Sequence, residues 1–198
     1  MRDLEIREAQ DDEVQAAAAV LSRAMRDNPI NIAAFGNDPE LRRKKLARVF
    51  GTMLPLMPQR PLLGLQDGTV AAVWGTAAPG SCQLTGRQKL RMTPAILACG
   101  IGTTSRVLTW LGEWGARDMR ETHWHLGPVG VDAQLQGRGI GSQMMREWCR
   151  LLDLRHVAGY LETDKSENVR FYGNFGFDTI AEAEILRTPN WFMVRGAR

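Results

Sequence analysis

The chain has 198 residues, of which 44% are hydrophobic and 24% charged, and its formal net charge is +3. These values are typical of a folded globular protein and exclude an intrinsically disordered one, and the length suits a single domain over residues 1–198. The sequence has neither the N-terminal apolar stretch of a signal peptide nor a run of ~18 apolar residues that could span a membrane. We therefore expect a cytoplasmic protein without a membrane partner.

Two further residue types narrow the classes of partner. The densest basic cluster, Arg42 to Lys45, is short, and we interpret it as a solvated helix face instead of a nucleic-acid patch. Three cysteines, Cys82, Cys99 and Cys149, show neither the CxxC nor the Cys/His spacing of a metal site. This pattern favours a reducing compartment and predicts neither nucleic acid nor a metal as partner.

The first half of the chain predicts helices that begin at local cap signals, and one hairpin. Asn28-Pro29 interrupts an alanine-rich helical pattern, and Asp38-Pro39, a cap followed by a first-turn proline, starts the next helix. Asp67-Gly68 favours a tight antiparallel turn because this pair tolerates positive φ angles. The expected elements are a strand at 4–9, a helix at 11–25, a helix at 39–57 and a hairpin of strands at 61–66 and 69–77.

The second half predicts helices and strands on both sides of a glycine-rich turn. Apolar residues recur at helical spacing around Gly100 and Gly102, which indicates two short helices between residues 84 and 119. Together with the first half, these elements predict a mixed sheet. The elements that follow are a strand at 122–131, a helix that ends near 154, a strand at 157–163, a short helix at 167–174, and strands at 177–186 and 190–195.

The segment VDAQLQGRGIGSQMM, residues 131–145, places three glycines between an expected strand and an expected helix. Such a turn leaves backbone N–H groups free and directs them, with the positive end of the helix dipole, at one spot that suits phosphate. A P-loop is excluded because no lysine follows the glycines, and a dinucleotide fingerprint fails at Ser142, where its third glycine belongs. A plain packing turn stays open as an alternative.

The strand before this turn cannot keep a regular alternation. Trp124 and Leu126 share one parity, whereas Val129 and Val131 share the other, so one extra residue must be accommodated between them. Gly127-Pro128 stands at that point, and glycine is common at bulges while proline cannot donate to a neighbouring strand. We expect the strand to bulge there, to separate from one neighbour and to leave backbone groups that can pair with a ligand's amides.

At these residues the sequence resembles the GCN5-related N-acetyltransferases, the GNAT family. QGRGIG, residues 136–141, matches that family's acetyl-CoA signature Q/R-x-x-G-x-G/A, with Ala133 where the family usually has proline. NVRFYGNFGF, residues 168–177, resembles its N-x-x-F-Y-x-x-x-G-F segment, and the order of the expected elements is similar. The signatures cover residues 122–178. Within the family the sequence looks most like the puromycin N-acetyltransferase-like branch.

The resemblance implies a fold, a cosubstrate and a reaction. The fold would be α/β (α+β): a mixed, twisted central sheet of about seven strands with flanking helices, in which strands 122–131 and 157–163 splay apart. The enzyme would be an acyltransferase that transfers the acetyl group of acetyl-CoA to a primary amine of a small molecule, such as an antibiotic or a metabolite, by direct attack in a ternary complex. Homodimers are common in the family.

The resemblance also assigns roles to individual residues. The backbone of strand 129–131 would pair with the pantetheine arm, and the turn would hold the pyrophosphate. Tyr172, of the FY motif, would return a proton to the CoA sulfur, because a phenol with a pKa of ~10 stays protonated at neutral pH; a structural aromatic is the alternative. Asn168 could equally cap a helix. The expected cofactor-binding residues are Val129, Gly130, Val131, Gln136, Gly137, Arg138, Gly139, Ile140, Gly141, Ser142 and Asn168.

Several groups could deprotonate the acceptor ammonium. Glu162, near the end of strand 157–163, would lie where this fold has a substrate-facing carboxylate and could act through a water. Glu121, His123 and His125 are rivals on or beside the preceding strand, and solvent alone is another. His123 and His125 share a strand face, but we expect no metal there because no third ligand has suitable spacing.

Three other functions stay open. A peptide or protein acetyltransferase would need an open, acidic or extended groove instead of a pocket closed by helices at 84–120. A CoA-binding regulatory module would keep the fold without turnover, and a dinucleotide-dependent oxidoreductase would use the glycines for another cofactor. We expect most aromatic and methionine side chains of the acceptor-side segments to pack in the core; these include Phe35, Met57, Trp110 and Trp114.

Overall fold

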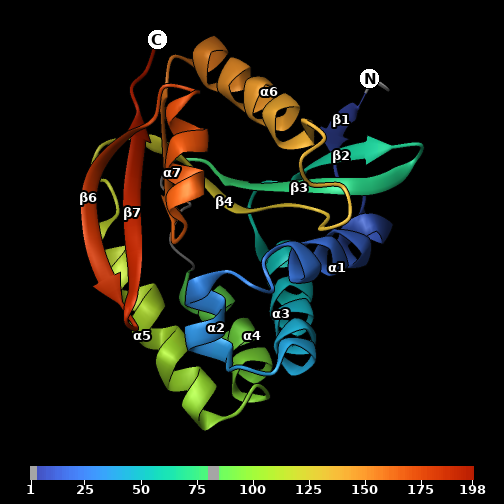
Figure 1. The fold of residues 1–198 in the computed structure, drawn as a ribbon, viewed down its shortest axis with the longest axis vertical. Helices are drawn as coiled ribbons and strands as arrows, with labels where there is room; N and C mark the ends of the chain where they lie inside the picture. Colours follow the sequence, from blue (N-terminus) through green and yellow to red (C-terminus); the bar gives the residue numbers. More distant parts are fainter. Residues whose placement is uncertain (1–3, 80–84) are drawn as a thin grey trace.

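The computed structural model describes residues 4–79 and 85–198. Cys82 and residue 84, the first residue of the segment in which two helices are expected, lie outside the described part. Within these residues, a seven-stranded sheet of order β1-β2-β3-β4-β5-β7-β6 forms the centre of the protein (Figure 1). The pair β4 and β5 is parallel, and the other neighbouring pairs are antiparallel. The expected mixed sheet is therefore confirmed.

Apart from the helix at residues 29–35, which was not expected, the elements follow the expected order, and the bounds of the strands agree with the sequence prediction to within two residues. In the described segments we find no helix with the length and apolar character that crossing a bilayer requires. The N-terminal elements are β1 (Glu5–Glu8), η1 (Asp11–Glu13), α1 (Val14–Ala24), α2 (Pro29–Phe35), α3 (Pro39–Met53), η2 (Leu54–Leu56), β2 (Leu62–Gln66) and β3 (Thr69–Ala77). The C-terminal elements are α4 (Gly86–Leu97), α5 (Ile101–Arg117), β4 (His123–Val131), α6 (Ile140–Arg155), β5 (Ala158–Thr163), α7 (Ser166–Gly173), β6 (Asp178–Ile185) and β7 (Thr188–Arg195).

Helices cover both faces of the sheet (Figure 1). α6 and α7 pack on one face, where Trp74 and Trp148 belong to the same buried cluster. α1 packs on the opposite face against β3 and β4, with Leu21 fully buried. Farther along that opposite face, α2 and α5 cover Tyr160 of β5 and Phe192 of β7. The sheet therefore lies between two helical layers.

Two features of the helices differ from the expectation. The helical pattern breaks before Pro29 as expected, but Pro29 then begins α2, a helix that was not expected, whose Ile30 N–H donates to the carboxylate of Asp164 at 2.7 Å. Because this partner comes from the other end of the chain, the local sequence could not show it. The break between α4 and α5 lies at Gly100, whose φ is +98°, whereas Gly102 lies inside α5, a helix of 17 residues.

The basic cluster at 42–45 is not a uniformly solvated helix face, as we expected. Arg42 is 3% exposed, and its guanidinium donates to the carbonyl oxygens of Arg26 and Gly36 and to the Asp27 carboxylate at 2.8 Å. A buried guanidinium needs such partners because an unpaired buried charge is costly. Arg42 therefore ties α3 to the segment between α1 and α2, which a pattern of basic residues does not reveal.

The bulge expected in β4 at Gly127-Pro128 is confirmed. Between two paired positions, β4 has one residue more than β3, and its extra backbone approaches β3 closely. A Cβ at Gly75 of β3 would lie 2.5 Å from Pro128 Cδ, so this position admits only glycine. The pairs on either side of the bulge are Trp74 with Val129 and Thr76 with Leu126.

The splay of β4 from β5 is confirmed by their pairing. Residues His123–His125 of β4 pair with Ala158–Tyr160 of β5, and the pairing ends there although both strands continue. On its other side, β4 stays paired with β3 as far as Val131. One edge of residues 126–131 therefore faces the gap between the two strands instead of a neighbouring strand.

Candidate functional site

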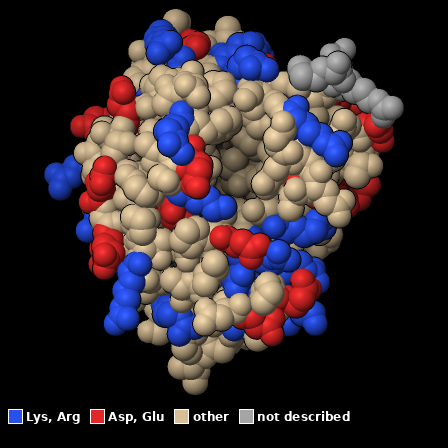
Figure 2. Space-filling view, viewed as in Figure 1, with Lys and Arg blue, Asp and Glu red and all other residues tan. Residues whose placement is uncertain are grey.

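A hollow of about 550 Å³ opens where β4 separates from β5. Its walls are the C-terminal end of α1, Trp74 of β3, the end of β4, the loop that leads to α6, and α7. Figure 2 shows a recess near the middle of this face, lined by uncharged atoms and with charged side chains at its rim. The expected cofactor-binding residues that line it are Val129, Gly130, Val131, Gln136, Gly137, Gly139, Ile140, Gly141, Ser142 and Asn168.

Asp132 shapes the loop between β4 and α6. Its carboxylate accepts the Gln134 N–H at 3.1 Å, and its carbonyl accepts the Leu135 N–H at 2.8 Å. Arg23 of α1 forms an ion pair with the same carboxylate. Burial alone would raise the pKa of Asp132, but the hydrogen bonds from Arg23 and Gln134 and the charge of Arg23 outweigh it, so the pKa lies below its usual value. Asp132 thereby fixes the loop to the α1 wall.

Two glycines of the loop are required by backbone conformation. Gly137 and Gly139 have φ values of +76° and +80°, which side-chain-bearing residues rarely adopt. A Cβ on either would meet nothing within 4 Å, so close packing does not explain them. Gly139 is the N-cap of α6, and the helix's first-turn N–H groups lack intrahelical acceptors. These donors and the helix dipole make the loop suitable for an anion.

Of two polar residues in the signature, one lines the hollow and the other lies outside its walls. The Gln136 amide donates to the Val131 carbonyl at 3.2 Å, so this side chain closes the loop onto the end of β4. Arg138 is exposed and does not line the hollow. Of the expected cofactor-binding residues, Arg138 is therefore the one that the structure leaves outside the walls.

The α1 wall lies unusually close to β4. A Cβ at Gly130 would be 2.7 Å from the Cβ of Ala24, so glycine allows the helix to approach the strand. Met25 and Asn28, which follow this helix, line the hollow beside the loop. Sequence reasoning did not assign a site role to any residue of this segment, because an alanine-rich helix gives no chemical signal for a ligand.

The α7 wall carries Asn168 and Tyr172. Asn168 lies inside α7, and its amide donates to Thr163 Oγ1 at 3.0 Å, so the alternative of a helix cap is wrong. Tyr172 is 7% exposed and lines the hollow. Burial, with a smaller contribution from the negative charge of Asp164, raises the pKa of Tyr172 well above its usual value. Its hydroxyl therefore stays protonated at neutral pH.

Glu162 does not line this hollow. It shares a face of β5 with Tyr160, opposite to the face that packs against α6 and α7. Its side chain is 3% exposed, and one carboxylate oxygen lies 2.8 Å from Nε2 of His125 on β4. The structure thus brings two of the expected base candidates together in one pair, on the other side of the sheet from α7.

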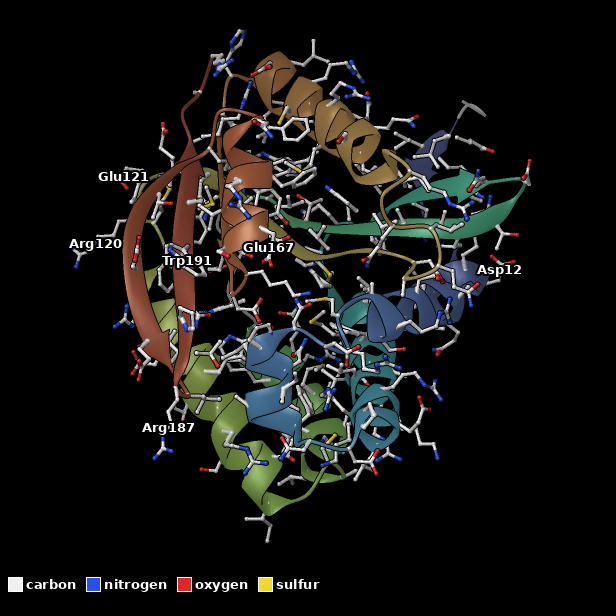
Figure 3. The ribbon with its side chains drawn as sticks, viewed as in Figure 1. Asp12, Arg120, Glu121, Glu167, Arg187 and Trp191 are labelled. Carbon is white, nitrogen blue, oxygen red and sulfur yellow. The ribbon has the colours of Figure 1, made fainter. Side chains whose placement is uncertain are left out.

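The remaining base candidates have different surroundings. Glu121 is exposed, and Figure 3 shows it at the outer edge of the molecule beside β6, away from the hollow. His123 is 4% exposed, with Nδ1 at 2.8 Å from the Glu121 carbonyl and Nε2 at 3.2 Å from Asp118. Asp118 follows α5 and was not singled out from the sequence, since nothing in its local pattern indicates that it meets strand β4.

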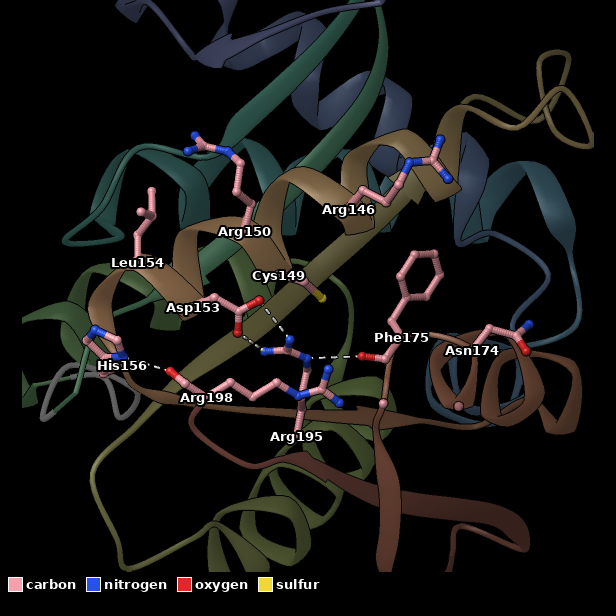
Figure 4. A pocket seen from close by; sticks show the side chains of 12 residues that line it. Arg146, Cys149, Arg150, Asp153, Leu154, His156, Asn174, Phe175, Arg195 and Arg198 are labelled. Carbon is pink, nitrogen blue, oxygen red and sulfur yellow. Dashed lines mark hydrogen bonds and ion pairs between the residues drawn. The ribbon is translucent and has the colours of Figure 1, made fainter.

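Another hollow, of about 940 Å³, lies between α6, α7 and the end of β7 (Figure 4). Arg195 is 3% exposed there and donates to the Asp153 carboxylate at 2.7 and 2.9 Å and to the Phe175 carbonyl at 3.0 Å. These groups satisfy one another and join the last strand to α6. Because none of the expected site residues, all of which the structure describes, lines this hollow, we assign it a structural role.

The comparisons with known proteins agree with this architecture. Residues 100–179 match the sequence model of a family described as acetyltransferase (GNAT) domain. One similar structure, from Corynebacterium glutamicum, is described as histone acetyltransferase HPA2 and related acetyltransferase. It is 14% identical in sequence, and the superposition, with a TM-score of 0.70, covers 98% of this chain and 97% of the Corynebacterium glutamicum chain. The chain has a GNAT fold. Two further acetyltransferase structures superpose over nearly the whole chain.

The first is a polyamine N-acetyltransferase of Drosophila melanogaster. It is 17% identical in sequence, and the superposition, with a TM-score of 0.65, covers 98% of this chain and 100% of the Drosophila melanogaster chain. The second is a GNAT family acetyltransferase of Brucella melitensis in complex with acetyl-CoA. It is 17% identical in sequence, and the superposition, with a TM-score of 0.55, covers 99% of this chain and 89% of the Brucella melitensis chain. The GNAT family match includes the signature turn and Tyr172, whereas residues 1–99 are related to these proteins through the fold. The puromycin-like branch stays a prediction.

Proposed function

We propose that this protein is an acetyl-CoA-dependent N-acetyltransferase of one domain that acts on a primary amine of a small molecule. The observation that carries the proposal is the hollow at the β4/β5 split, which the first turn of α6, the end of β4 and Tyr172 line together. A helix N-terminus suits a pyrophosphate, and a free strand edge suits the amides of a pantetheine arm. The GNAT family match and the Brucella melitensis complex with acetyl-CoA support this assignment.

The reaction forms a C–N bond and breaks a C–S bond. In a ternary complex, the neutral amine nitrogen attacks the thioester carbonyl carbon, and a backbone N–H of β4 stabilises the oxyanion of the tetrahedral intermediate. The attacking nitrogen loses its extra proton to solvent, and the intermediate collapses and releases the CoA thiolate. Tyr172 donates its hydroxyl proton to that sulfur, and solvent restores the proton to the phenol. The position of Tyr172 in the wall of the hollow supports this role, and a phenol is protonated at neutral pH, as a proton donor must be.

Glu162 and His125 together are our choice for the group that receives the proton of the acceptor ammonium. The two side chains are hydrogen-bonded at 2.8 Å, and neither is more than 18% exposed. A carboxylate that orients an imidazole is a common arrangement for proton transfer, and a water can link it to the amine. The exposed position of Glu121 removes that residue from the choice.

The acceptor side of the sheet supports a small substrate. α2 and α5 cover the face of β5 and β7 on which Tyr160 and Phe192 are both 0% exposed. Trp110 and Trp114 of α5 pack into the same cluster, as we expected for core residues. This cover closes that part of the sheet to an extended peptide, which favours a small acceptor. The Drosophila melanogaster neighbour, whose described product is N-acetylagmatine, also favours a small amine.

A protein acetyltransferase is the second function to be tested, because the Corynebacterium glutamicum neighbour is described as a histone acetyltransferase. The experiment is a thiol-release assay with acetyl-CoA and a panel of agmatine, puromycin and a lysine-containing peptide. We expect release with at least one small amine and its loss in Tyr172→Phe. Release with the peptide alone would replace the small-molecule assignment, and acetyl-CoA binding without release by any acceptor would favour a regulatory module.

A further inference from the structure

A cluster of metal-ligand side chains lies where the end of α5 meets the beginning of β4. Asp118, His123 and His125 each place one potential ligand atom within 4.8 Å of the other two. The cluster is largely buried, since His123 is 4% exposed and the side chains of Asp118 and His125 are 13% and 18% exposed. The sequence suggested only the two histidines, and the fold supplies the carboxylate as a third ligand.

The imidazole of His123 lies between two hydrogen-bond acceptors. Its Nδ1 is 2.8 Å from the Glu121 carbonyl oxygen, which carries no proton, so Nδ1 must be the donor. Its Nε2 is 3.2 Å from a carboxylate oxygen of Asp118. In a neutral ring, Nε2 then presents a lone pair to a negative oxygen. This position therefore requires a cation between the two atoms, either a second proton on the ring or a metal ion.

His125 has the partner typical of a metal-ligating histidine. Its Nε2 is 2.8 Å from the Glu162 carboxylate, whose side chain is only 3% exposed. Histidines that bind metals commonly hold a carboxylate or a backbone carbonyl with their other ring nitrogen, which fixes the ring and its tautomer. Both forms occur here: His123 holds the backbone carbonyl of Glu121, and His125 holds the carboxylate of Glu162.

The charge of the cluster also favours a cation. Two carboxylates border its imidazoles: Asp118 lies 3.2 Å from Nε2 of His123, and Glu162 lies 2.8 Å from Nε2 of His125. A bound cation would balance the negative charge of these two largely buried side chains.

We propose that Asp118, His123 and His125 bind one Zn²⁺ or a similar transition-metal ion. Two imidazoles and one carboxylate are ligands that suit zinc, whereas calcium and magnesium prefer oxygen alone. Tetrahedral zinc holds its ligand atoms about 3.4 Å apart, so rotation of side chains must draw the most distant pair together. Three protein ligands leave the fourth position to water.

Zinc at this site would inhibit acetyl transfer, because it occupies the His125 ring that pairs with Glu162. This consequence rests on the proposed function, whereas metal binding itself does not. The two can be separated, since binding is measured on the protein without any substrate.

The experiment titrates the chelator-treated, dialysed full chain with ZnCl₂ in a calorimeter. We expect one ion per wild-type chain and an affinity at least about tenfold weaker in each of Asp118→Asn, His123→Gln and His125→Gln. His156→Gln is the matched control, because the chain's third histidine is exposed at the end of α6. Thermal unfolding of each variant establishes that it folds, and the conservative Asp118→Asn keeps the test valid if a histidine variant does not.

Absence of stoichiometric binding to wild type, or equal weakening by His156→Gln, would overturn the proposal and leave His123 as an imidazolium paired with Asp118. If zinc binds and the acetylation rate of an active preparation is unchanged, the site stands and its inhibitory role is wrong. If no acceptor is acetylated under any condition, the proposed function fails while the titration still decides the metal site.

Discussion

Tyr172 has aromatic neighbours on two sides, with ring centroids 5.3 Å from Phe171 and 6.2 Å from Phe177. These contacts hold the ring whether or not it carries a hydroxyl. We therefore expect Tyr172→Phe to retain acetyl-CoA affinity and thermal stability while kcat falls by about a hundredfold or more, because the proton donor for the thiolate is lost. Calorimetry and steady-state kinetics with the best acceptor measure the two quantities. A wild-type kcat in this variant would refute the assignment.

Gly139 combines a positive φ with open space beside its Cα. Gly139→Ala should cost about 1 kcal/mol of strain, and a loop that relaxes to relieve it should bind acetyl-CoA about tenfold more weakly, since ~1.4 kcal/mol corresponds to tenfold. Gly112→Ala is the control, because Gly112 is equally open but lies inside α5. That change should leave affinity unaltered and stabilise the helix by about 0.5–1 kcal/mol. Equal affinities in both variants would contradict a ligand role for the loop.

The residues that sequence alone could place are those whose role depends on backbone conformation. The glycines of QGRGIG and the bulge at Gly127-Pro128 follow from φ angles and parity, which are local properties. Asp164 meets Ile30 across 134 residues, and Asp118 meets His123 only because the chain turns between the end of α5 and the start of β4; no periodicity shows either contact. Site residues of that second kind require the fold to be known.

At the scale of elements, α2 depends on a cap from outside its own segment. Asp164 accepts the Ile30 N–H at 2.7 Å and lies close enough to Tyr172 to influence its pKa. Asp38 caps α3 in the ordinary way, by accepting the N–H groups of Glu40 and Leu41. Asp164, which caps α2 beside the site, can therefore be compared with Asp38, which caps α3 away from the site.

We expect Asp164→Ala and Asp38→Ala each to lower the free energy of unfolding by about 1 kcal/mol. Only Asp164→Ala should also lower kcat/KM, because release of α2 moves Asn28 in the wall of the hollow. Urea unfolding and steady-state kinetics measure these effects. A similar kcat/KM in the two variants would show that the position of α2 has no part in the reaction.

Strands were easier to predict than helices. Each strand shows alternation or a bounded apolar run, and the Asp67-Gly68 turn has the φ values of +51° and +74° that its residue types favour. The seven-residue α2 carries neither a local side-chain cap nor a long amphipathic repeat, so the sequence showed the break before Pro29 but not the helix that follows it. The spatial order of the sheet, with β7 between β5 and β6, is set by long-range pairing that no local pattern shows.

At the scale of the whole molecule, the pair of Asp153 and Arg195 joins α6 to the last strand. Arg195 is 3% exposed, whereas the Asp153 side chain is 42% exposed, so solvent screens part of the interaction. We expect Asp153→Asn to lower the free energy of unfolding by about 1 kcal/mol. Glu147→Gln, in the exposed pair with Arg150 on the same helix, is the control and should have a smaller effect.

This contribution should depend on pH in a defined direction. The hydrogen bonds from Arg195 lower the pKa of Asp153 below its unfolded value of ~3.9. A depressed folded pKa means that the stabilisation is fully present above the unfolded value and is lost as the pH falls through the folded one. The difference between wild type and Asp153→Asn, measured by urea unfolding, should therefore vanish in strong acid. A difference that persists there would show that the charge of Asp153 is not its source.

The central claim is that the hollow at the β4/β5 split binds acetyl-CoA. Calorimetric titration of the purified chain with acetyl-CoA, with NAD and ATP in parallel, tests it most directly. We predict one acetyl-CoA per chain with micromolar affinity and no comparable binding of the other two nucleotides. Failure to bind acetyl-CoA, or equal binding of NAD, would contradict the claim and mean that QGRGIG is only a turn between a strand and a helix without a role in acetyl-CoA binding.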